Sequence, residues 1–445
     1  MATAVVLPNN KILLVGGSHC FAMTFGPGGA CGSNTFDGFE CDALQTAELY
    51  DETTKAFTVA GSGSSSMMTA QRSAATATLI EGSGTSLDGK VLITGGSSGS
   101  SFLSASPPPT GCGPSGQVAQ NTAEIYDPVA DSFTATGSIP GCTAGTAPPT
   151  CTTGLPATCG TGMAQCGLVD SDAVLLNSGK VLVTGGDYIQ FLGQSSPQAF
   201  IFNPATATFS QTVAMKVPRE LPSINKLPNG NVLVAGGLTG ASGACVATPS
   251  TPVAITTNSS AEVFDPTVPS WTLTTGSSST PGATGGMNTK RIAAGSLFTS
   301  GTDSGLVIFA GGIDAESSDG TTPDFPKCEA ITNIQQTTET ATDLYNPTTT
   351  VFTATGLLNQ SRGGYGFGIL NGGTHSGDLA VFGGECAIGN LASAAIGTSD
   401  AAGLCGMSAQ TDYYELFSPT TGMWTVGTAT TPTTPANAPQ SAVLP

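Results

Sequence analysis

The chain has 445 residues, contains only 9% charged residues and carries a formal net charge of -18. An acidic chain repels a phosphate backbone, so we expect no nucleic-acid partner. Its apolar residues come in short runs, far below the roughly 18 residues of a membrane span, and no basic amphipathic stretch is present. We therefore expect no membrane insertion.

From the N-terminus onwards, one sequence cassette recurs six times. In each copy a β-branched run ends in a glycine pair, and a strand with an aromatic residue follows downstream, with a second aromatic seven residues after the first. An acid stands two residues before the first aromatic in every copy but the third, which has Phe200 there. The glycine pairs are Gly16-Gly17, Gly95-Gly96, Gly185-Gly186, Gly236-Gly237, Gly311-Gly312 and Gly383-Gly384. The aromatic pairs are Tyr50/Phe57, Tyr126/Phe133, Phe202/Phe209, Phe264/Trp271, Tyr345/Phe352 and Phe417/Trp424. This regularity indicates a repeat protein.

The fourth cassette shows the predicted secondary structure of the unit. Short apolar runs that end in glycine or in an Asp-Pro turn favour strands over helices. The predicted strands of this cassette are 220–227, 232–235, 261–264 and 271–274. Four consecutive antiparallel strands would form one twisted sheet.

The glycine pairs, the acid-x-aromatic strands and the Phe or Trp of the fourth strand resemble the kelch repeats of β-propellers, including galactose oxidase-like propeller domains. The resemblance extends from about residue 4 to 427 and implies an all-β fold of six four-stranded antiparallel blades around a channel. It implies no single function. We predict one propeller domain, residues 1–435, with blades near 4–62, 72–138, 166–214, 219–276, 290–356 and 362–428.

Loop lengths predict which face of the ring carries function. With the strands of a blade lettered A to D, the A–B and C–D turns lie on one face and are short. The B–C and D–A loops lie on the other face, and these are long and irregular in sequence. We expect this decorated face to be the binding face.

Twelve cysteines fall in the long loops of the decorated face. The close Cys pairs of zinc sites are missing, so we interpret the cysteines as disulfides that hold these loops. They are Cys20, Cys31, Cys41, Cys112, Cys142, Cys151, Cys159, Cys166, Cys245, Cys328, Cys386 and Cys405. Disulfides and a Ser/Thr/Gly-rich, charge-poor surface predict an extracellular or cell-surface protein.

Histidine restricts the chemistry that the chain can perform. His19 follows the first glycine pair on the decorated face, and His375 lies in an A–B turn on the opposite face. The resemblance to galactose oxidase would imply a copper centre of two histidines and two tyrosines, one crosslinked to cysteine. Two histidines on opposite faces depart from that pattern, so we predict no catalytic residue and no copper.

The four arginines of the chain each lie near the start of an A strand, where the resemblance places the rim of the channel. They are Arg72, Arg219, Arg291 and Arg362. As candidate ligand-binding residues they would form a positive ring for a carboxylate or an anionic sugar. The alternative is an ion pair with the C-strand acid of each blade. Those acids are Glu48, Glu124, Glu262, Asp343 and Glu415.

Acidic residues suggest two further sites. Asp314, Glu316 and Asp319 share a B–C loop and are candidate calcium ligands, with solvated surface acid as the alternative. No other cofactor is predicted. A carbohydrate-active enzyme would need two acids at the channel mouth, one of them with a raised pKa, and Asp170 and Asp172 are candidates without a diagnostic spacing.

The last residues of the chain, 439–445, repeat the sequence of the first A strand. Six blades need six A strands, so residues 436–445 form a surplus strand. The chain could be cut from a longer propeller of seven or more blades. The strand could instead add to the closing blade or replace its A strand. It could also complete a blade in a neighbouring copy and build a homo-oligomer or filament.

These features favour a non-catalytic extracellular propeller that binds a protein or a glycan at the decorated face, or that serves in assembly. One alternative is a surface or filament subunit that self-assembles by strand addition. Another is a carbohydrate-active enzyme or carbohydrate-binding propeller.

Overall fold

The protein is described from a computed structural model. The structure describes residues 2–25, 31–61, 67–103, 118–140, 167–187, 195–239, 256–277, 286–317, 334–384, 388–390 and 414–427. Within this part of the chain the regular structure is β-strand, apart from a short 3-10 turn, η3 (Gly373–His375). The surplus strand predicted at 436–445 lies outside the described residues.

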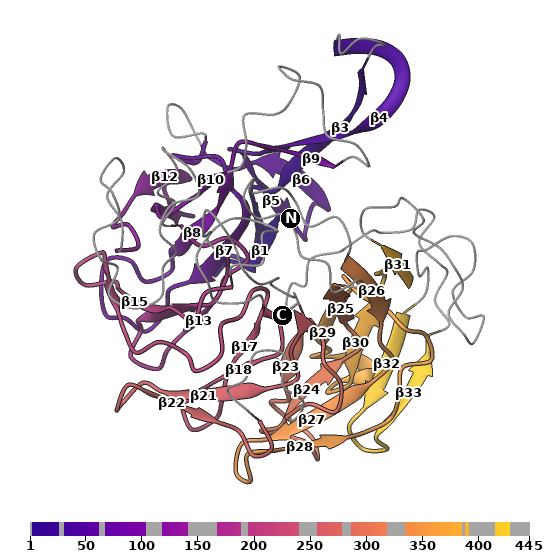
Figure 1. The fold of residues 1–445 in the computed structure, drawn as a ribbon. Helices are drawn as coiled ribbons and strands as arrows, with labels where there is room; N and C mark the ends of the chain where they lie inside the picture. Colours follow the sequence, from indigo (N-terminus) through magenta and orange to yellow (C-terminus); the bar gives the residue numbers. More distant parts are fainter. Residues whose placement is uncertain are drawn as a thin grey trace, which may run out of the picture.

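Six antiparallel sheets surround a common centre, which confirms the predicted six-bladed propeller (Figure 1). Blade 1 is β1 (Thr3–Val6), β2 (Lys11–Val15), β5 (Ala47–Asp51) and β6 (Ala56–Val59). Blade 2 is β7 (Ser73–Leu79), β8 (Val91–Ser98), β11 (Ala123–Asp127) and β12 (Ser132–Ala135), with β10 (Val118–Ala119) also paired to β8. Blade 3 is β13 (Asp172–Leu175), β14 (Val181–Thr184), β15 (Ala199–Asn203) and β16 (Thr208–Gln211).

The second half of the ring repeats this order. Blade 4 is β17 (Ser223–Lys226), β18 (Val232–Ala235), β21 (Ala261–Asp265) and β22 (Ser270–Leu273). Blade 5 is β23 (Gly295–Leu297), β24 (Val307–Ala310), β27 (Thr342–Asn346) and β28 (Val351–Ala354). Blade 6 is β29 (Gly366–Ile369), β30 (Leu379–Phe382), β32 (Tyr414–Ser418) and β33 (Met423–Val426). The first strand of each blade is innermost in Figure 1, and the fourth is outermost.

The constant seven-residue aromatic offset is the register of the C–D hairpin. In blade 4, Phe264 lies directly opposite Trp271, and their ring centroids are 4.9 Å apart. The same cross-strand contact recurs in the other five blades. Such pairs stabilise a sheet beyond the area that they bury.

The glycine pairs of blades 1 to 5 join each of these blades to the next. The second glycine, Gly237 in blade 4, donates its N–H to the carbonyl of Arg291 in blade 5 at 3.1 Å. A Cβ on the first glycine, Gly236, would lie 2.6 Å from that same carbonyl oxygen, and both glycines have positive φ. Only glycine suits this close approach of two backbones.

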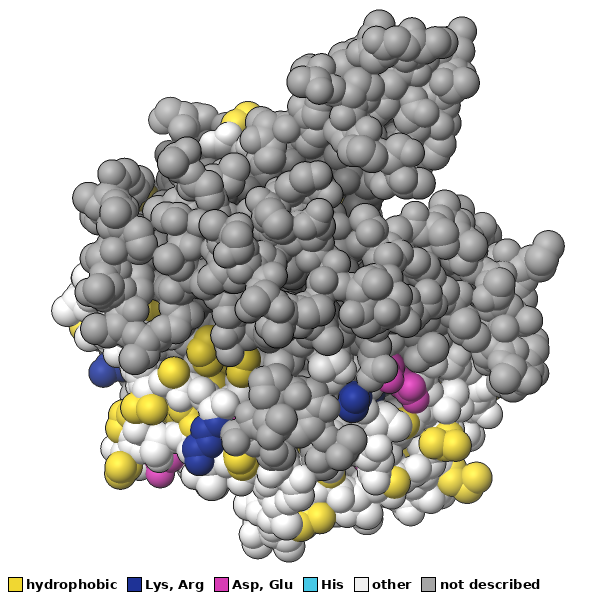
Figure 2. All heavy atoms as spheres, viewed as in Figure 1, with side chains coloured by type: hydrophobic (Ala, Val, Ile, Leu, Met, Phe, Trp, Pro, Cys, Tyr) yellow, Lys and Arg dark blue, Asp and Glu magenta, His cyan; other side chains and the backbone are white. Residues whose placement is uncertain are grey.

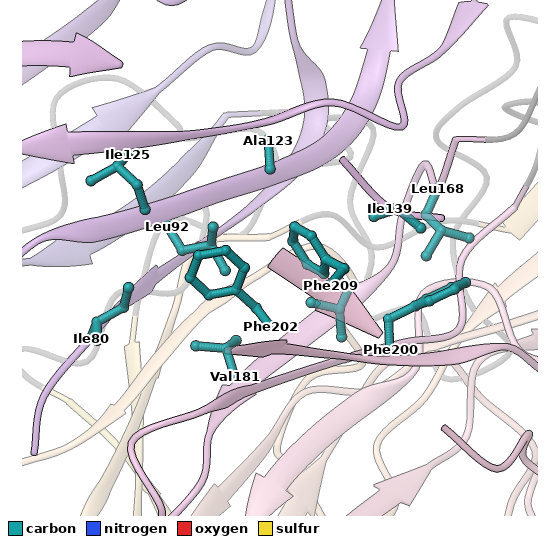
Figure 3. Packing of buried hydrophobic residues seen from close by; sticks show 11 residues of the cluster. Ile80, Leu92, Ala123, Ile125, Ile139, Leu168, Val181, Phe200, Phe202 and Phe209 are labelled. Atoms are coloured by element: carbon teal, nitrogen blue, oxygen red, sulfur yellow. The ribbon is translucent and has the colours of Figure 1, made fainter. Parts of the chain in front are cut away.

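Buried apolar residues fill the spaces between neighbouring blades. Figure 3 shows the cluster between blades 2 and 3, where Leu92 and Ile125 pack against Phe202 and Phe209. Equivalent clusters join blades 1 and 2, 3 and 4, 4 and 5, and 5 and 6. Among the described residues, no such cluster joins blade 6 to blade 1.

The described parts of the B–C loops, although irregular in sequence, form two further sheets. One sheet joins blades 1 and 2 through β3 (Ser18–Phe25), β4 (Cys31–Ala43) and β9 (Ser100–Leu103). The other joins blades 4, 5 and 6 through β19 (Leu238–Thr239), β20 (Thr256–Thr257), β25 (Ile313–Ser317), β26 (Ile334–Thr338) and β31 (Ile388–Asn390). Pairing between loops satisfies backbone groups that the loops of a single blade would leave open.

Charged side chains are sparse on the described part of the face shown in Figure 2, in keeping with the low charge of the sequence. No helix in the described residues is long and apolar enough to cross a membrane.

Candidate functional site

Each arginine lies at the inner end of its blade, in a buried space beside the C-strand acid that we call the slot. In blade 4 the Arg219 side chain is fully buried, and its Nη2 lies 3.5 Å from Glu262 Oε1. Its Nη1 donates to the carbonyls of Gly236 and Ser260, at 2.8 Å each. Burial lowers the pKa of Arg219, and the Glu262 carboxylate opposes that shift. The guanidinium is thus surrounded by acceptors of its own blade.

Blades 2, 5 and 6 repeat this ion pair. The nearest N–O distances are 2.7 Å for Arg72 and Glu124, 2.5 Å for Arg291 and Asp343, and 2.9 Å for Arg362 and Glu415. All eight side chains of the four pairs have 0% exposure. This burial favours the ion-pair interpretation of the arginines over a ring that binds a ligand.

Blade 3 fills the slot with apolar side chains. The carbonyl of Leu168 accepts the N–H of Gly96, as the arginine carbonyls accept the N–H of the preceding glycine pair. Leu168 therefore occupies the arginine position, and Phe200 occupies the acid position two residues before Phe202. Both side chains are buried in the cluster shown in Figure 3.

Three acids lie together where blades 3 and 4 meet. Asp187 directly follows the glycine pair of blade 3, and its N–H donates to the Val169 carbonyl at 2.7 Å. Asp170 follows Val169 in sequence, and the Asp170 carbonyl accepts the N–H of Leu221 at 3.0 Å. Glu220 precedes Leu221, so these bonds bring the backbones of Asp170, Asp187 and Glu220 together. We refer to these three residues as the acid cluster.

The acid cluster interrupts an inner ring of small or apolar residues. Asp170 is the second residue after the slot position of its blade. The equivalent residues of blades 2, 4, 5 and 6 are Ala74, Leu221, Ala293 and Gly364. Asp170 has a φ of 53°, and backbone hydrogen bonds link it to Ala74 on one side and Leu221 on the other. Its equivalents Ala74, Leu221 and Gly364 have φ values of 55°, 51° and 58°, so the left-handed conformation belongs to the repeat and not to the acid.

Burial controls the ionisation of the acid cluster. Its three members are at most 3% exposed. Burial and the Asp187 charge raise the pKa of Asp170 to about 7. Burial raises the pKa of Glu220 well above its usual value, and the charges of Asp187 and Asp170 add to that shift. Burial therefore favours the protonated form of Asp170 and Glu220, although the charge of the N-terminal ammonium acts against this shift at Asp170.

Two oxygens of the acid cluster, Asp170 Oδ2 and Glu220 Oε1, have no hydrogen-bond partner among the described residues. Asp172, two residues from Asp170, is half-buried and accepts the Ile224 N–H at 3.3 Å. Burial raises the pKa of Asp172 to about 7, against the lowering effect of bonds from the Ala173 and Ile224 N–H groups. The site therefore contains two buried acceptors without a partner among the described residues, in acids whose pKa is raised.

The sequence alone identified Asp170 and Asp172 as candidates and missed Asp187 and Glu220. The available signal was positional, but it was clear only for Glu220. Glu220 follows a slot arginine where other blades have Ser73, Ile292 and Gly363. Asp187 follows a glycine pair where blades 1, 2, 4 and 5 have Ser18, Ser97, Leu238 and Ile313, but blade 6 also has an acid there, Glu385.

No protein-family profile matches this chain, and no curated protein is similar to it in sequence. Among solved structures, one similar chain is described as "Structure of YjhT". It has 16% identity and a TM-score of 0.46, and the match covers 96% of this chain and 97% of that one. Another is a fungal alcohol oxidase of the AA5 family in complex with copper. It has 12% identity and a TM-score of 0.50, and the match covers 98% of this chain and 66% of the oxidase.

The fold is a six-bladed β-propeller. At these identities the similarity extends to the fold alone, so the copper and the activity of the oxidase belong to that protein. In this propeller His375 lies in η3, between β29 and β30, with its Nδ1 3.0 Å from Asp378 Oδ2. His19 lies in β3, within the sheet formed by B–C loops.

The remaining predicted sites of the propeller are only partly described. Asp314 accepts a hydrogen bond from Thr257, but Asp319 and the Glu316 side chain lie outside the described residues. No group of three His, Cys, Asp or Glu residues within the described ranges is placed to hold a metal. Calcium binding therefore stays a prediction.

Cys41 has the one cysteine side chain that the structure describes, and it is disulfide-bonded. It lies in β4, where its register partners are Cys20 in β3 and Ser101 in β9. The side chains of the other eleven cysteines lie outside the described part, so their disulfides stay a prediction.

Proposed function

We propose that the protein is a non-catalytic, extracellular binding propeller, and that the acid cluster holds a hydroxyl-rich ligand such as a glycan. The unpartnered buried oxygens of Asp170 and Glu220 carry this proposal. A protonated carboxyl group both donates and accepts hydrogen bonds, as does a sugar hydroxyl. A ligand that made these bonds would remove the cost of leaving buried acceptors unpaired.

The place of the acid cluster supports the same function. Asp187 begins a B–C loop, and Asp170 and Glu220 begin A strands, so all three lie at the end of the blades that carries the two additional sheets. Ligands of ring-shaped folds commonly bind where loops extend from one face. The twelve cysteines and the disulfide of Cys41 support an extracellular location.

A glycan array tests the proposal directly. We expect the wild-type protein to bind at least one glycan class, and Asp170→Asn and Glu220→Gln to weaken that binding at least tenfold. Glu81→Gln is the matched control, because Glu81 is an exposed acid in the A–B turn of blade 2, at the opposite face. Equal binding by all four proteins, or by none, would contradict the proposal.

A carbohydrate-active enzyme is the second candidate, because Asp170 and Asp172 both have a pKa of about 7 and could donate a proton at neutral pH. The bound glycan should then be hydrolysed, and the rate should fall as pH rises through 7. If the glycan is hydrolysed, and if Asp170→Asn or Asp172→Asn abolishes the hydrolysis, the protein is a carbohydrate-active enzyme and not a binding propeller.

A further inference from the structure

The chain contains two sequons for N-linked glycosylation, which have the form Asn-x-Ser with x other than proline. The first is Asn258-Ser259-Ser260 in blade 4, and the second is Asn359-Gln360-Ser361 in blade 6. In sequence the two sequons are equivalent. Their places in the blades differ, and this difference decides which of the two asparagines has room for a glycan.

Asn258 lies inside the junction of blades 4 and 5. Its carbonyl accepts the N–H of Arg291 at 3.3 Å, and the residue has 0% exposure. Its Nδ2 donates to Thr239 Oγ1 at 2.9 Å, and its Oδ1 accepts the N–H of Ser260 at 2.9 Å. A glycan on Nδ2 would have to pass through closely packed atoms, so the folded protein has no room for it.

The enclosure of Asn258 belongs to the repeat. Four other blades have an equivalent residue whose carbonyl accepts the N–H of the slot residue in the next blade. These equivalents are Leu44, Gln120, Ser196 and Glu339. None of the four is exposed. A side chain at this position is therefore enclosed wherever the structure describes it.

Asn359 lies at the surface, three residues before the slot arginine of blade 6, and it is exposed. Its backbone N–H and its Nδ2 both donate to Glu415 Oε2, at 2.6 and 2.8 Å. A glycan replaces one of the two Nδ2 hydrogens and leaves the other to donate to Glu415. Glu415 also keeps the hydrogen bonds from the Gln360 N–H and from Arg362 Nη2. The slot of blade 6 therefore keeps its bonds beneath a glycan.

The exposure of Asn359 also belongs to the repeat. Its equivalents in blades 2, 4 and 5 are Thr69, Lys216 and Asn288, and we call these four residues the rim position. All four are exposed, and the backbone N–H of each donates to the C-strand acid of its blade. The rim position accepts side chains as different as threonine and lysine, so space lies outside the blade at this point.

We propose that Asn359 accepts an N-linked glycan, and that Asn258 does not, when the chain is exported past an oligosaccharyltransferase. Asn359 Nδ2 forms a bond to the anomeric carbon of an oligosaccharide that a lipid pyrophosphate carries. The bond from that carbon to the pyrophosphate oxygen breaks, the lipid pyrophosphate leaves with the electron pair, and Nδ2 loses one proton. This modification rests on the proposed extracellular location and is independent of the acid cluster.

Attachment precedes folding, because the sequon is covered in the folded protein. Ser361 is 4% exposed, and its Oγ accepts a hydrogen bond from Thr338 Oγ1 at 3.0 Å. In the unfolded chain both sequons are accessible. A chain that carries a glycan on Asn258 is unable to close the junction of blades 4 and 5, so folding selects the chains that are modified at Asn359 alone.

Peptide mapping by mass spectrometry tests the proposal on the intact protein secreted from a eukaryotic host. We expect the Asn359 peptide to carry a glycan that a peptide N-glycosidase removes, and the Asn258 peptide to be unmodified. Asn359→Gln should abolish the mass shift that the glycosidase causes in the intact protein. Asn288→Gln is the matched control, because it makes the same change at the rim position of a blade without a sequon; it should leave that mass shift unchanged.

Lys290→Ser supplies a second test, because it converts Asn288-Thr289-Lys290 into a sequon at the rim position of blade 5. The secreted variant should carry one glycan more than the wild type. An unmodified Asn359, a glycan on Asn258 of the secreted protein, or a secreted Lys290→Ser variant without the additional glycan would each overturn the proposal. A silent glycan array together with a modified Asn359 would contradict the glycan-binding function alone.

Discussion

Blades 3 and 4 are neighbours with the same strand order, yet they fill the same slot in opposite ways. Blade 4 buries Arg219 against Glu262, and blade 3 buries Leu168 beside Phe200. A buried ion pair gains little over apolar residues of similar volume, because desolvation offsets the attraction between the charges. The comparison teaches that the slot needs a complementary pair rather than a particular charge.

Blade 1 extends this comparison, since it keeps the acid but has no arginine. Its Glu48 is exposed, whereas Glu262 has no exposed surface. An acid without its partner is tolerated there because water solvates it. In a blade where the slot is covered, a carboxylate without its arginine would be buried, and that burial would cost free energy.

The largest effect should come from breaking the pair of blade 4. Arg219→Leu leaves Glu262 buried without its cation and should lower the free energy of unfolding by about 3–5 kcal/mol. The double variant Arg219→Leu/Glu262→Phe copies blade 3 and should recover most of that loss. Denaturant unfolding of the two variants measures the difference. A double variant no more stable than the single one would mean that the arginine is required for its bonds to the Gly236 and Ser260 carbonyls.

The reverse exchange in blade 3 should have a somewhat smaller effect. Phe200→Glu places a carboxyl group in an apolar cluster and should destabilise the protein by about 3 kcal/mol. Adding Leu168→Arg should restore part of the stability through the ion pair that the other blades use. The coupling energy from a double-mutant cycle is the measurement. Additive losses would show that blade 3 has diverged too far to accept the pair.

The smallest effect should be the pH dependence of the blade 3 and 4 junction. The pKa of Asp170 is raised to about 7 in the folded protein. The folded state therefore binds more protons than the unfolded state between about pH 4 and 7, and stability falls as pH rises through that window. Asp170→Asn should remove roughly 2–3 kcal/mol of this dependence between pH 5 and pH 8. Thermal unfolding at pH 5 and pH 8 tests it, with Glu81→Gln as the control. An unchanged slope in Asp170→Asn would place the titration elsewhere.

Much of the fold could be predicted because the residues of the cassette depend on local geometry, namely the register of a hairpin and the distance between two backbones. A seven-residue offset between Phe264 and Trp271 fixes the hairpin register that brings the two rings into tilted contact. A glycine pair such as Gly236-Gly237 records a backbone approach too close for a side chain. Both constraints act within one blade or between adjacent blades, so each blade repeats them in sequence.

The candidate site could be predicted only in part. Asp170 was identified as a carboxylate near the channel mouth, but its partners Asp187 and Glu220 were not. They come from different loops and meet only through the hydrogen bonds that join blade 3 to blade 4. The ion pairs were one of two alternatives, because the position of an arginine in sequence does not reveal whether its head group is covered.

The sequence by itself determined the number of blades, their strand order and the register of their outer hairpins, since these follow from local, repeated patterns. Only the tertiary structure decided which charges are buried. It closed Arg219 onto Glu262, gathered three acids where blades 3 and 4 meet, and left Glu48 and Phe57 of blade 1 exposed. Burial of a residue depends on which residues of the neighbouring blade cover it, and the sequence of a single cassette does not contain that information.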